Sequence, residues 1–493
     1  MLQLEFAFYF MHLSMTSLYI PLLMVVTFLL LEWLFISYFS ITPTTFRDYV
    51  VSTKRHDTPL LVYIILFTFL ESGLIVRTIQ QVHNLGLPWI IFEFLSSCMP
   101  FWIISCLALR MAPFMDNLSM SETIGSMYGR YPMLIISLSN ICCSIVVIAI
   151  QMNIISLAIS ICLDWVHPNI ITFLTILLLA SYTVVGRMRV FSLTNIAQLA
   201  AFLITPLILS CWISMRIDQS LLELFRRLFT SQEKIHFSSL CHSDFNPPAI
   251  LSLFLANLVS CIQPLIIQKV YMSSDHFQAR TVFFYTGIFG VIIKFFILLF
   301  GVIVLAAAPQ LPLTEIWSYI LTDMPPALKG FVAISLLAVA ISVADIYLNT
   351  ASVMFSHDII EGLMGQKGIL YRYQIRLAKL TALLMGLVAI LLSSYCDDLM
   401  ELCKLYFDCF IPVATAPFIL AVLGFRGTSR TILIGMVTGI LAIWSWNKWI
   451  EPITTINGAF PSMVANCLAI VAAHYLCARP KKQVKVDPER QTN

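Results

Sequence analysis

Charged side chains are scarce in this sequence. Asp, Glu, Lys and Arg make up 11% of the 493 residues, 59% are hydrophobic, and the mean hydropathy is +0.89. Soluble domains contain about 45–50% apolar residues, so this composition excludes an ordinary soluble domain and predicts a multi-span membrane protein. The net charge of +3 is too small, and the basic residues too dispersed, for a nucleic-acid-binding surface.

Several chemical sites are also missing. The thirteen cysteines show no metal-ligand spacing, and most lie in apolar runs, where cysteine packs as a small hydrophobic residue. No nucleophile, base and oxyanion donor can be placed together, so we expect neither an enzyme nor a bound cofactor. No polar stretch is long enough for a soluble domain. The first apolar run lacks a small-residue cleavage site, and we interpret it as a retained span.

Long apolar runs are the abundant feature. A transmembrane helix needs about 20 apolar residues, and charged or turn-forming clusters mark its ends. The sequence therefore predicts an all-α membrane protein with about thirteen transmembrane helices, at residues 15–40, 61–82, 88–110, 132–163, 168–186, 190–215, 249–272, 282–308, 328–361, 376–396, 400–424, 430–449 and 461–478.

The distribution of Lys and Arg predicts the orientation. With the amino terminus outside, twenty of these residues fall in the inner loops and tail and six fall on the outer side. This positive-inside bias predicts a multi-pass protein of the cell membrane with a cytoplasmic carboxyl terminus. We expect the tail at 479–493 to be disordered, because it is polar and charged.

The span at 61–82 contains residues that hydrocarbon does not tolerate. Glu71 and Arg77 are ionisable, and Ser72-Gly73 weakens the helix. A charge at this depth costs at least about 2.5–3.5 kcal/mol on insertion scales, so such residues normally face a cavity or a partner. The stretch therefore predicts a binding site.

The partners of Glu71 and Arg77 are open at this point. A structural ion pair between the two is one interpretation. They are six residues apart, which places them on different faces of an unbroken helix. We favour partners on other spans, with Asp345 and Lys294 as candidates. Lys294 is either a solute-facing group or one half of a structural ion pair.

The span at 249–272 is interrupted as well, by Gln263-Pro264. A simple proline kink is one explanation. However, this span is the fifth after 61–82 and enters the membrane from the opposite side. Interrupted helices at matching positions of two oppositely oriented halves indicate a midplane transport site. We predict repeats at 61–215 and 249–424, with peripheral helices at 15–40, 430–449 and 461–478.

From about residue 46 to 445 the chain resembles the sodium/solute symporter family, and its sodium/proline branch in particular. The resemblance rests on the order and spacing of several stretches: Phe46-Arg47-Asp48-Tyr49-Val50-Val51, Ser72-Gly73, Ser121-Glu122-Thr123, Tyr128-Gly129-Arg130-Tyr131, Ser192-Leu193-Thr194-Asn195-Ile196-Ala197-Gln198, Gln263-Pro264 through Lys269 with Ala279-Arg280, Ile341-Ser342-Val343-Ala344-Asp345 with Asn349, and His357-Asp358-Ile359. It implies the five-plus-five inverted repeat of the leucine-transporter type.

The resemblance also implies a sodium site between the second and ninth spans. Backbone carbonyls of Thr68, Glu71 and Val339 would be ligands, and the hydroxyl pair would fall on Ser342 and Val343. Valine offers no hydroxyl oxygen, although a hard cation requires oxygen ligands.

Two further positions depart from the family pattern. The family commonly has an aspartate at Asn195, and the proline branch has an acidic residue at Leu70. Sodium coupling, proton coupling through Glu71, and uncoupled or lost transport therefore remain alternatives.

The resemblance implies a secondary active transporter that carries a small organic solute, such as proline or another amino acid, together with Na⁺ or H⁺. The expected partners are the solute, the coupling cation and the lipid bilayer. The expected substrate-binding residues are Glu71, Ser72, Gly73, Arg77, Gln263, Pro264 and Lys294. A membrane sensor without transport is the rival from another class. Glu401, Lys404 and Asp408, spaced three and four apart, predict a charge network within one helix.

Overall fold

The structure is a computed structural model that describes residues 20–34, 38, 57–70, 73–162, 193–217, 223, 226, 247–361, 371–396 and 398–477. Regular structure in these ranges is helical. The first half contains the helix Ile20–Leu34, α3 (Thr58–Phe69), α4 (Gly73–Leu85), α5 (Leu87–Ser96), α6 (Met99–Ala108), η1 (Ala112–Phe114), α7 (Met120–Tyr128), α8 (Arg130–Cys162) and α10 (Leu193–Ile217).

The second half continues the helical pattern. It contains α12 (Pro247–Ser260), α13 (Pro264–Tyr271), α14 (His276–Ala307), η5 (Leu313–Glu315), α15 (Ile316–Leu321), α16 (Pro326–Met354), η6 (Phe355–Glu361), α18 (Tyr371–Tyr395), α19 (Leu399–Phe410), η7 (Ile411–Thr415), α20 (Ala416–Val422), α21 (Ser429–Ser445), η8 (Trp446–Ile450), α22 (Glu451–Thr454) and α23 (Ala459–Cys477).

The predicted all-α fold is confirmed. Within the described ranges, nine helices are long and apolar enough to cross a membrane, and the bent pair α3 and α4 brings the number to ten. Two shorter apolar helices, Ile20–Leu34 and Leu380–Tyr395, match two further predicted spans. The predicted span at 168–186 and the tail at 479–493 lie outside the described residues. The repeat boundaries stay predictions.

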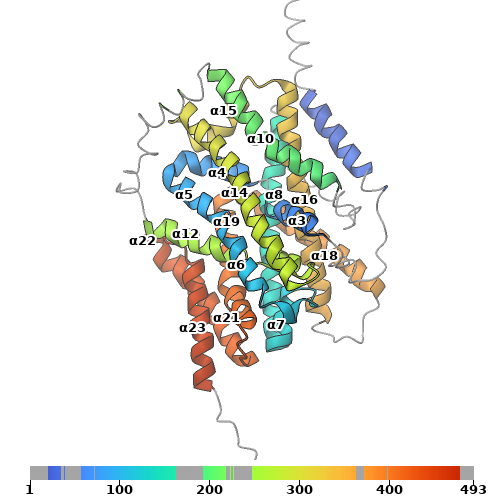
Figure 1. The fold of residues 1–493 in the computed structure, drawn as a ribbon, viewed down its shortest axis with the longest axis vertical. Coiled ribbons are helices and arrows are strands. Elements are labelled where there is room, and N and C mark those ends of the chain that lie inside the picture. Colours follow the sequence, from blue (N-terminus) through green and yellow to red (C-terminus); the bar gives the residue numbers. More distant parts are fainter. Residues whose placement is uncertain are drawn as a thin grey trace, which may run out of the picture.

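Helices α8 and α16 form the centre of the bundle (Figure 1). Helix α16 is apolar around most of its circumference, and nearly all of its residues from Gly330 to Met354 are buried. A helix that is hydrophobic all round must be covered by protein or lipid on every side. Here, protein covers it, so polar groups on α16 face other helices.

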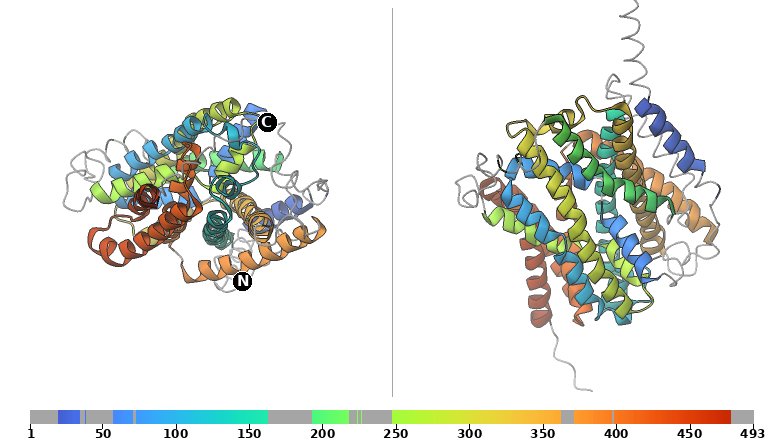
Figure 2. Two further views of the ribbon diagram at one scale, coloured as in Figure 1. Left: turned by 90° about the horizontal axis from the view of Figure 1, so that it is seen from below. Right: turned by 45° about the horizontal axis from the view of Figure 1, so that its top comes forward.

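Two short helices in the connections lie far apart. Helices α7 and α15, which belong to a predicted inner loop and a predicted outer loop, lie at opposite ends of the bundle (Figure 1). Helices α21 and α23 form one edge, while Ile20–Leu34 and α18 lie on the other side (Figure 2). The helix Ile20–Leu34 is therefore peripheral to the core.

Candidate functional site

Both interrupted spans are broken helices. Helix α3 ends at Phe69, α4 begins at Gly73, and the two segments are bent by 56°. Leu70 follows α3 with ψ 77°, outside the helical region. Helix α12 ends at Ser260 and α13 begins at Pro264. Helix α3 contacts α13, so segments of the two broken spans are neighbours in the bundle. Glu71 and Ser72 lie outside the described residues.

Pro264 begins a helix and does not kink a continuous one. Gln263, the N-cap residue, has an extended backbone with φ −109° and ψ 155°. The first N–H groups of a helix have no intrahelical acceptor, so a proline at this position removes no helical hydrogen bond. The interruption in the second span is thus a change of backbone direction at Gln263.

The side chain of Gln263 joins three segments. Its Oε1 accepts hydrogen bonds from the hydroxyl of Tyr347 on α16, at 3.3 Å, and from the hydroxyl of Tyr406 on α19. A glutamine and two tyrosines thus converge beside the second break. Gln263 is predicted from the sequence to bind solute. In the structure, its amide lies beside the hydroxyls of Tyr347 and Tyr406, so polar groups from three segments are close together.

Lys294 on α14 forms an ion pair with Glu93 on α5. The Nζ–Oε1 distance is 2.9 Å, and both side chains are almost completely buried. Thr78 Oγ1 donates to Glu93 Oε1 at 3.3 Å, and Ser96 Oγ donates to Glu93 Oε2 at 3.2 Å. A buried carboxylate needs such donors to offset its lost hydration. This cluster connects α4, α5 and α14 on the interior of the bundle.

Arg77 projects from the broken span toward α19. Its Nη1 donates to Cys403 Sγ at 2.7 Å, and its charge also acts on Glu93. Lys294 and Asp345 are the two predicted partners on other spans for Glu71 and Arg77. Lys294 instead pairs with Glu93, with 2.9 Å between Nζ and Oε1. The other candidate, Asp345, is partly buried on α16, and its side chain makes no hydrogen bond or ion pair with the described part of the chain. Among the described residues in this part of the bundle, Arg77 and Lys294 are basic and Glu93 is acidic.

The predicted ion-site residues that the structure describes occupy two elements. Thr68 lies in the last turn of α3, where carbonyl oxygens lack intrahelical donors. Val339, Ser342 and Val343 lie in the buried middle of α16. Ser342 Oγ donates to Gln198 Oε1 at 2.8 Å. Val343 is completely buried and supplies no side-chain oxygen.

The sequence as a whole matches one known family. The family model of the sodium:solute symporter family matches residues 72–439, about three-quarters of the chain, from the start of α4 through the second break and α16. This chain belongs to the sodium:solute symporter family. The predicted family resemblance is therefore confirmed.

Individual relatives of this symporter-family chain are distant. Sodium/proline symporter 2 of Staphylococcus saprophyticus is 27% identical over 164 residues, and the match covers 32% of each chain, about a third of that protein's length. The structure of a Na⁺-coupled sialic acid symporter in a substrate-bound outward-open state is similar with a TM-score of 0.78. That match, at 19% identity, covers 93% of this chain and 96% of the other, and it confirms the predicted leucine-transporter-like fold. A manganese transporter of Eremococcus coleocola, bound to an aromatic bis-isothiourea compound, has a TM-score of 0.46 at 12% identity, with 90% and 94% coverage.

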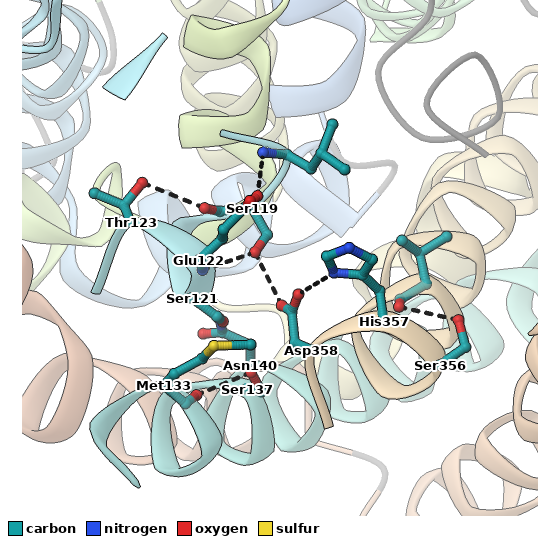
Figure 3. A network of polar contacts seen from close by, with 12 residues as sticks. Ser119, Ser121, Glu122, Thr123, Met133, Ser137, Asn140, Ser356, His357 and Asp358 are labelled. Carbon is teal, nitrogen blue, oxygen red and sulfur yellow. Dashed lines mark hydrogen bonds and ion pairs between the residues drawn. The ribbon is translucent and has the colours of Figure 1, made fainter. Parts of the chain in front are cut away.

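At the predicted inner end of this symporter-family chain, a polar network joins α7 to the end of α16 (Figure 3). Ser119 Oγ accepts from the backbone N–H of Glu122 at 3.0 Å and donates to Asp358 Oδ2 at 2.9 Å. Glu122 Oε2 in turn accepts from the backbone N–H of Leu118 at 2.6 Å. His357 Nδ1 lies 2.9 Å from Asp358 Oδ1. The same serine thus caps α7 and ties it to the π-helical η6.

The predicted charge network within the span at 400–424 is present only in part: the charge of Lys404 acts on Asp408 one turn away, but the direct contacts of all three residues are made elsewhere. Lys404 Nζ pairs with Glu451 Oε1 at 2.7 Å, and Asp408 Oδ2 accepts from Asn447 Nδ2 at 2.6 Å. Glu401 Oε2 accepts from Cys396 Sγ at 3.4 Å. The preferred partners come from neighbouring segments, because tertiary packing places them nearer than the next turn of the same helix.

Four residues of the polar interior were not predicted from the sequence: Glu32, Glu93, Tyr347 and Tyr406. A signal existed for the two glutamates. Each is a carboxylate within an apolar run long enough to span a membrane, which is the argument that identified Glu71. The tyrosines carried no such signal, because single aromatic residues are common throughout transmembrane helices.

Proposed function

We propose that this protein is a secondary active transporter that couples the downhill movement of Na⁺ to the uptake of a small zwitterionic solute, such as an amino acid. The observation that carries the proposal is the meeting of two broken helices, with Gln263 and its two tyrosines at one break and Arg77 beyond the other. Broken helices expose backbone polar groups at membrane depth, and these are tolerated only beside a cavity or another helix.

The charges of the site favour a zwitterion. The guanidinium of Arg77 can bind a carboxylate bidentately. Glu93, whose oxygens already accept from Lys294, Thr78 and Ser96, would contribute a negative potential that an ammonium prefers. Gln263 and Tyr406 would hold the remainder of the solute through hydrogen bonds. The partial similarity to a sodium/proline symporter supports the same solute class.

Sodium would bind between the end of α3 and the middle of α16. Thr68, Glu71 and Val339 would supply carbonyl oxygens, and Ser342 a hydroxyl oxygen. Ser72, Gly73 and Pro264 would shape the solute site through their backbone. Alternating exposure of this site to the two membrane faces would then carry both substrates inward. The predicted orientation, with the carboxyl terminus in the cytoplasm, belongs to the same proposal.

Proton-coupled transport is the second candidate, and one observation favours it. Val343 occupies the position of the second hydroxyl ligand and is completely buried. A sodium site with one hydroxyl fewer has fewer oxygen ligands, which weakens binding of a hard cation. A carboxylate such as Glu71 would carry the proton instead.

Transport by the purified protein in proteoliposomes separates the candidates. A library of amino acids and other small metabolites is first screened by thermal shift, with and without Na⁺. Uptake of each hit is then measured under a sodium gradient alone and under a proton gradient alone. Accumulation driven by sodium alone supports the main proposal. Accumulation driven only by protons supports the second candidate, and uptake with neither gradient contradicts both.

A further inference from the structure

A buried carboxylate on the peripheral helix reaches the proposed sodium site through one amide. Glu32 is 6% exposed, although its neighbours Leu31 and Trp33 on the helix Ile20–Leu34 are 67% and 43% exposed. Gln198 on α10 donates from Nε2 to Glu32 Oε1 at 2.6 Å. The other end of that amide, Oε1, accepts from Ser342 Oγ at 2.8 Å.

The chemistry of the three groups sets the direction of this chain. An ionised carboxylate can only accept hydrogen bonds, so the NH₂ end of Gln198 must face Glu32. The carbonyl end of the same amide then faces Ser342. A serine hydroxyl has one proton, and Ser342 donates it to Gln198. The lone pairs of Ser342 Oγ are therefore left for another partner. A hydroxyl oxygen coordinates a hard cation through such lone pairs.

The surroundings strengthen this chain. A cavity of about 240 Å³ lies beside Glu32 and Gln198, and its other walls are apolar, formed by Phe28, Leu31, Ala197, Ala201, Ile334 and Ala338. In such a low-dielectric environment, consecutive hydrogen bonds polarise one another. An ionised Glu32 would thus polarise the amide of Gln198 and, through it, the hydroxyl of Ser342.

We propose that Glu32 is a positioning residue for the coupling ion. It fixes the orientation of the Gln198 amide, and this amide holds the hydroxyl of Ser342 so that its oxygen faces the ion. The proposal rests on the proposed function, because it takes Ser342 as a sodium ligand. It makes the peripheral helix Ile20–Leu34 a part of the coupling machinery, although that helix lies outside both predicted repeats.

The test measures sodium binding directly on the purified full-length protein. Binding of ²²Na⁺ is titrated by scintillation proximity for the wild type, Glu32→Ala and Glu32→Gln. We expect Glu32→Ala to weaken sodium binding by roughly fivefold to tenfold, less than the loss of a direct hydrogen bond to a charged group, because Glu32 acts on the ion only through Gln198 and Ser342. Glu32→Gln keeps an acceptor oxygen without the charge, so its effect should be smaller.

Thr27→Val is the matched control on the same helix. Thr27 is exposed, and its Oγ1 donates to Leu23 O within the helix, so this variant should bind sodium like the wild type. Gln198→Leu should weaken sodium binding as much as Glu32→Ala. The double variant should be no worse than either single variant, because all three interrupt the same chain. Additive losses would overturn the proposal.

A transport measurement separates positioning from a structural role. At saturating sodium, the half-saturating solute concentration should stay within about twofold of the wild type in Glu32→Gln, while the sodium requirement rises. A reduced maximal rate with unchanged sodium affinity in both Glu32 variants would overturn the inference and leave the proposed function intact. A wild-type protein that binds no sodium would overturn the proposed function and this inference with it.

Discussion

Lys294 Nζ and Glu93 Oε1 lie 2.9 Å apart, and their side chains are only 4% and 2% exposed. The pair joins α14 to α5, more than 200 residues away in sequence. Removing one partner of a buried ion pair leaves an uncompensated charge, whereas replacing both with apolar residues is often tolerated. This asymmetry distinguishes a structural pair from one that binds solute.

We therefore predict that Lys294→Met and Glu93→Leu each lower the free energy of unfolding by about 3–5 kcal/mol. The double variant should recover much of this loss in thermal unfolding of the detergent-solubilised protein, but it should not recover transport. Full recovery of transport would show that the pair is structural. Lys404→Met is the control, because its ion pair with Glu451 is partly exposed and should contribute only about 0–1 kcal/mol.

Tyr406→Phe tests the hydrogen bond to Gln263. The variant loses one neutral hydrogen bond, which contributes about 0.5–1.5 kcal/mol. The half-saturating solute concentration should rise by about threefold to tenfold, with little change in sodium affinity. Tyr395→Phe is the control, since Tyr395 is 90% exposed. An equal effect of both variants in the uptake assay would contradict a role for Tyr406 at the solute site.

Arg77→Met tests whether the guanidinium recognises a carboxylate. Solutes with a carboxylate should lose affinity by at least about tenfold, because a charge-assisted hydrogen bond is lost. Neutral analogues should lose little. Uptake competition with matched acid and amide analogues measures the difference. Arg216→Met, which removes contacts to Tyr319 and Asp323 away from the site, should not change this selectivity. Equal loss for both analogues would indicate a folding role for Arg77.

Val343→Thr tests the weakened sodium site. Threonine is close to valine in shape and adds a hydroxyl at the position where the family resemblance places an oxygen ligand. We expect the sodium concentration for half-maximal uptake to fall by roughly threefold to tenfold. Val332→Thr, at a completely buried position on the same helix, should give no such gain. Unchanged sodium dependence in Val343→Thr would argue against a cation at this position.

Ser119→Ala tests the connection between α7 and η6. It removes the N-cap of α7 and a donor to the buried Asp358, so the free energy of unfolding should fall by about 1–3 kcal/mol. Thermal unfolding provides the measurement. Ser126→Ala, whose hydroxyl donates to Thr123 O within α7, should cost less than half as much. Similar losses for the two variants would mean that the link to Asp358 stabilises little.

The two breaks were predictable because their cause is local. Gly73 and Pro264 both lie at the first residue of a helix. Proline is tolerated at a helix start, and glycine weakens a helix interior. Each residue therefore indicated the end of a helical segment from the sequence alone. The partners of the ionisable residues were not predictable in this way. Glu93 was available to Lys294 only because α5 and α14 pack together.

The sequence by itself determined the membrane-embedded, all-helical class, the placement of most spans and both interruptions. These follow from hydrophobicity and backbone chemistry within 20 to 30 consecutive residues. Only the tertiary structure decided which polar groups meet: Lys294 with Glu93, Gln263 with two tyrosines, and Ser342 with Gln198 and Glu32. Such contacts depend on how helices far apart in the chain are rotated and packed. An apolar environment forces a polar group to find a partner, but the packing selects which one.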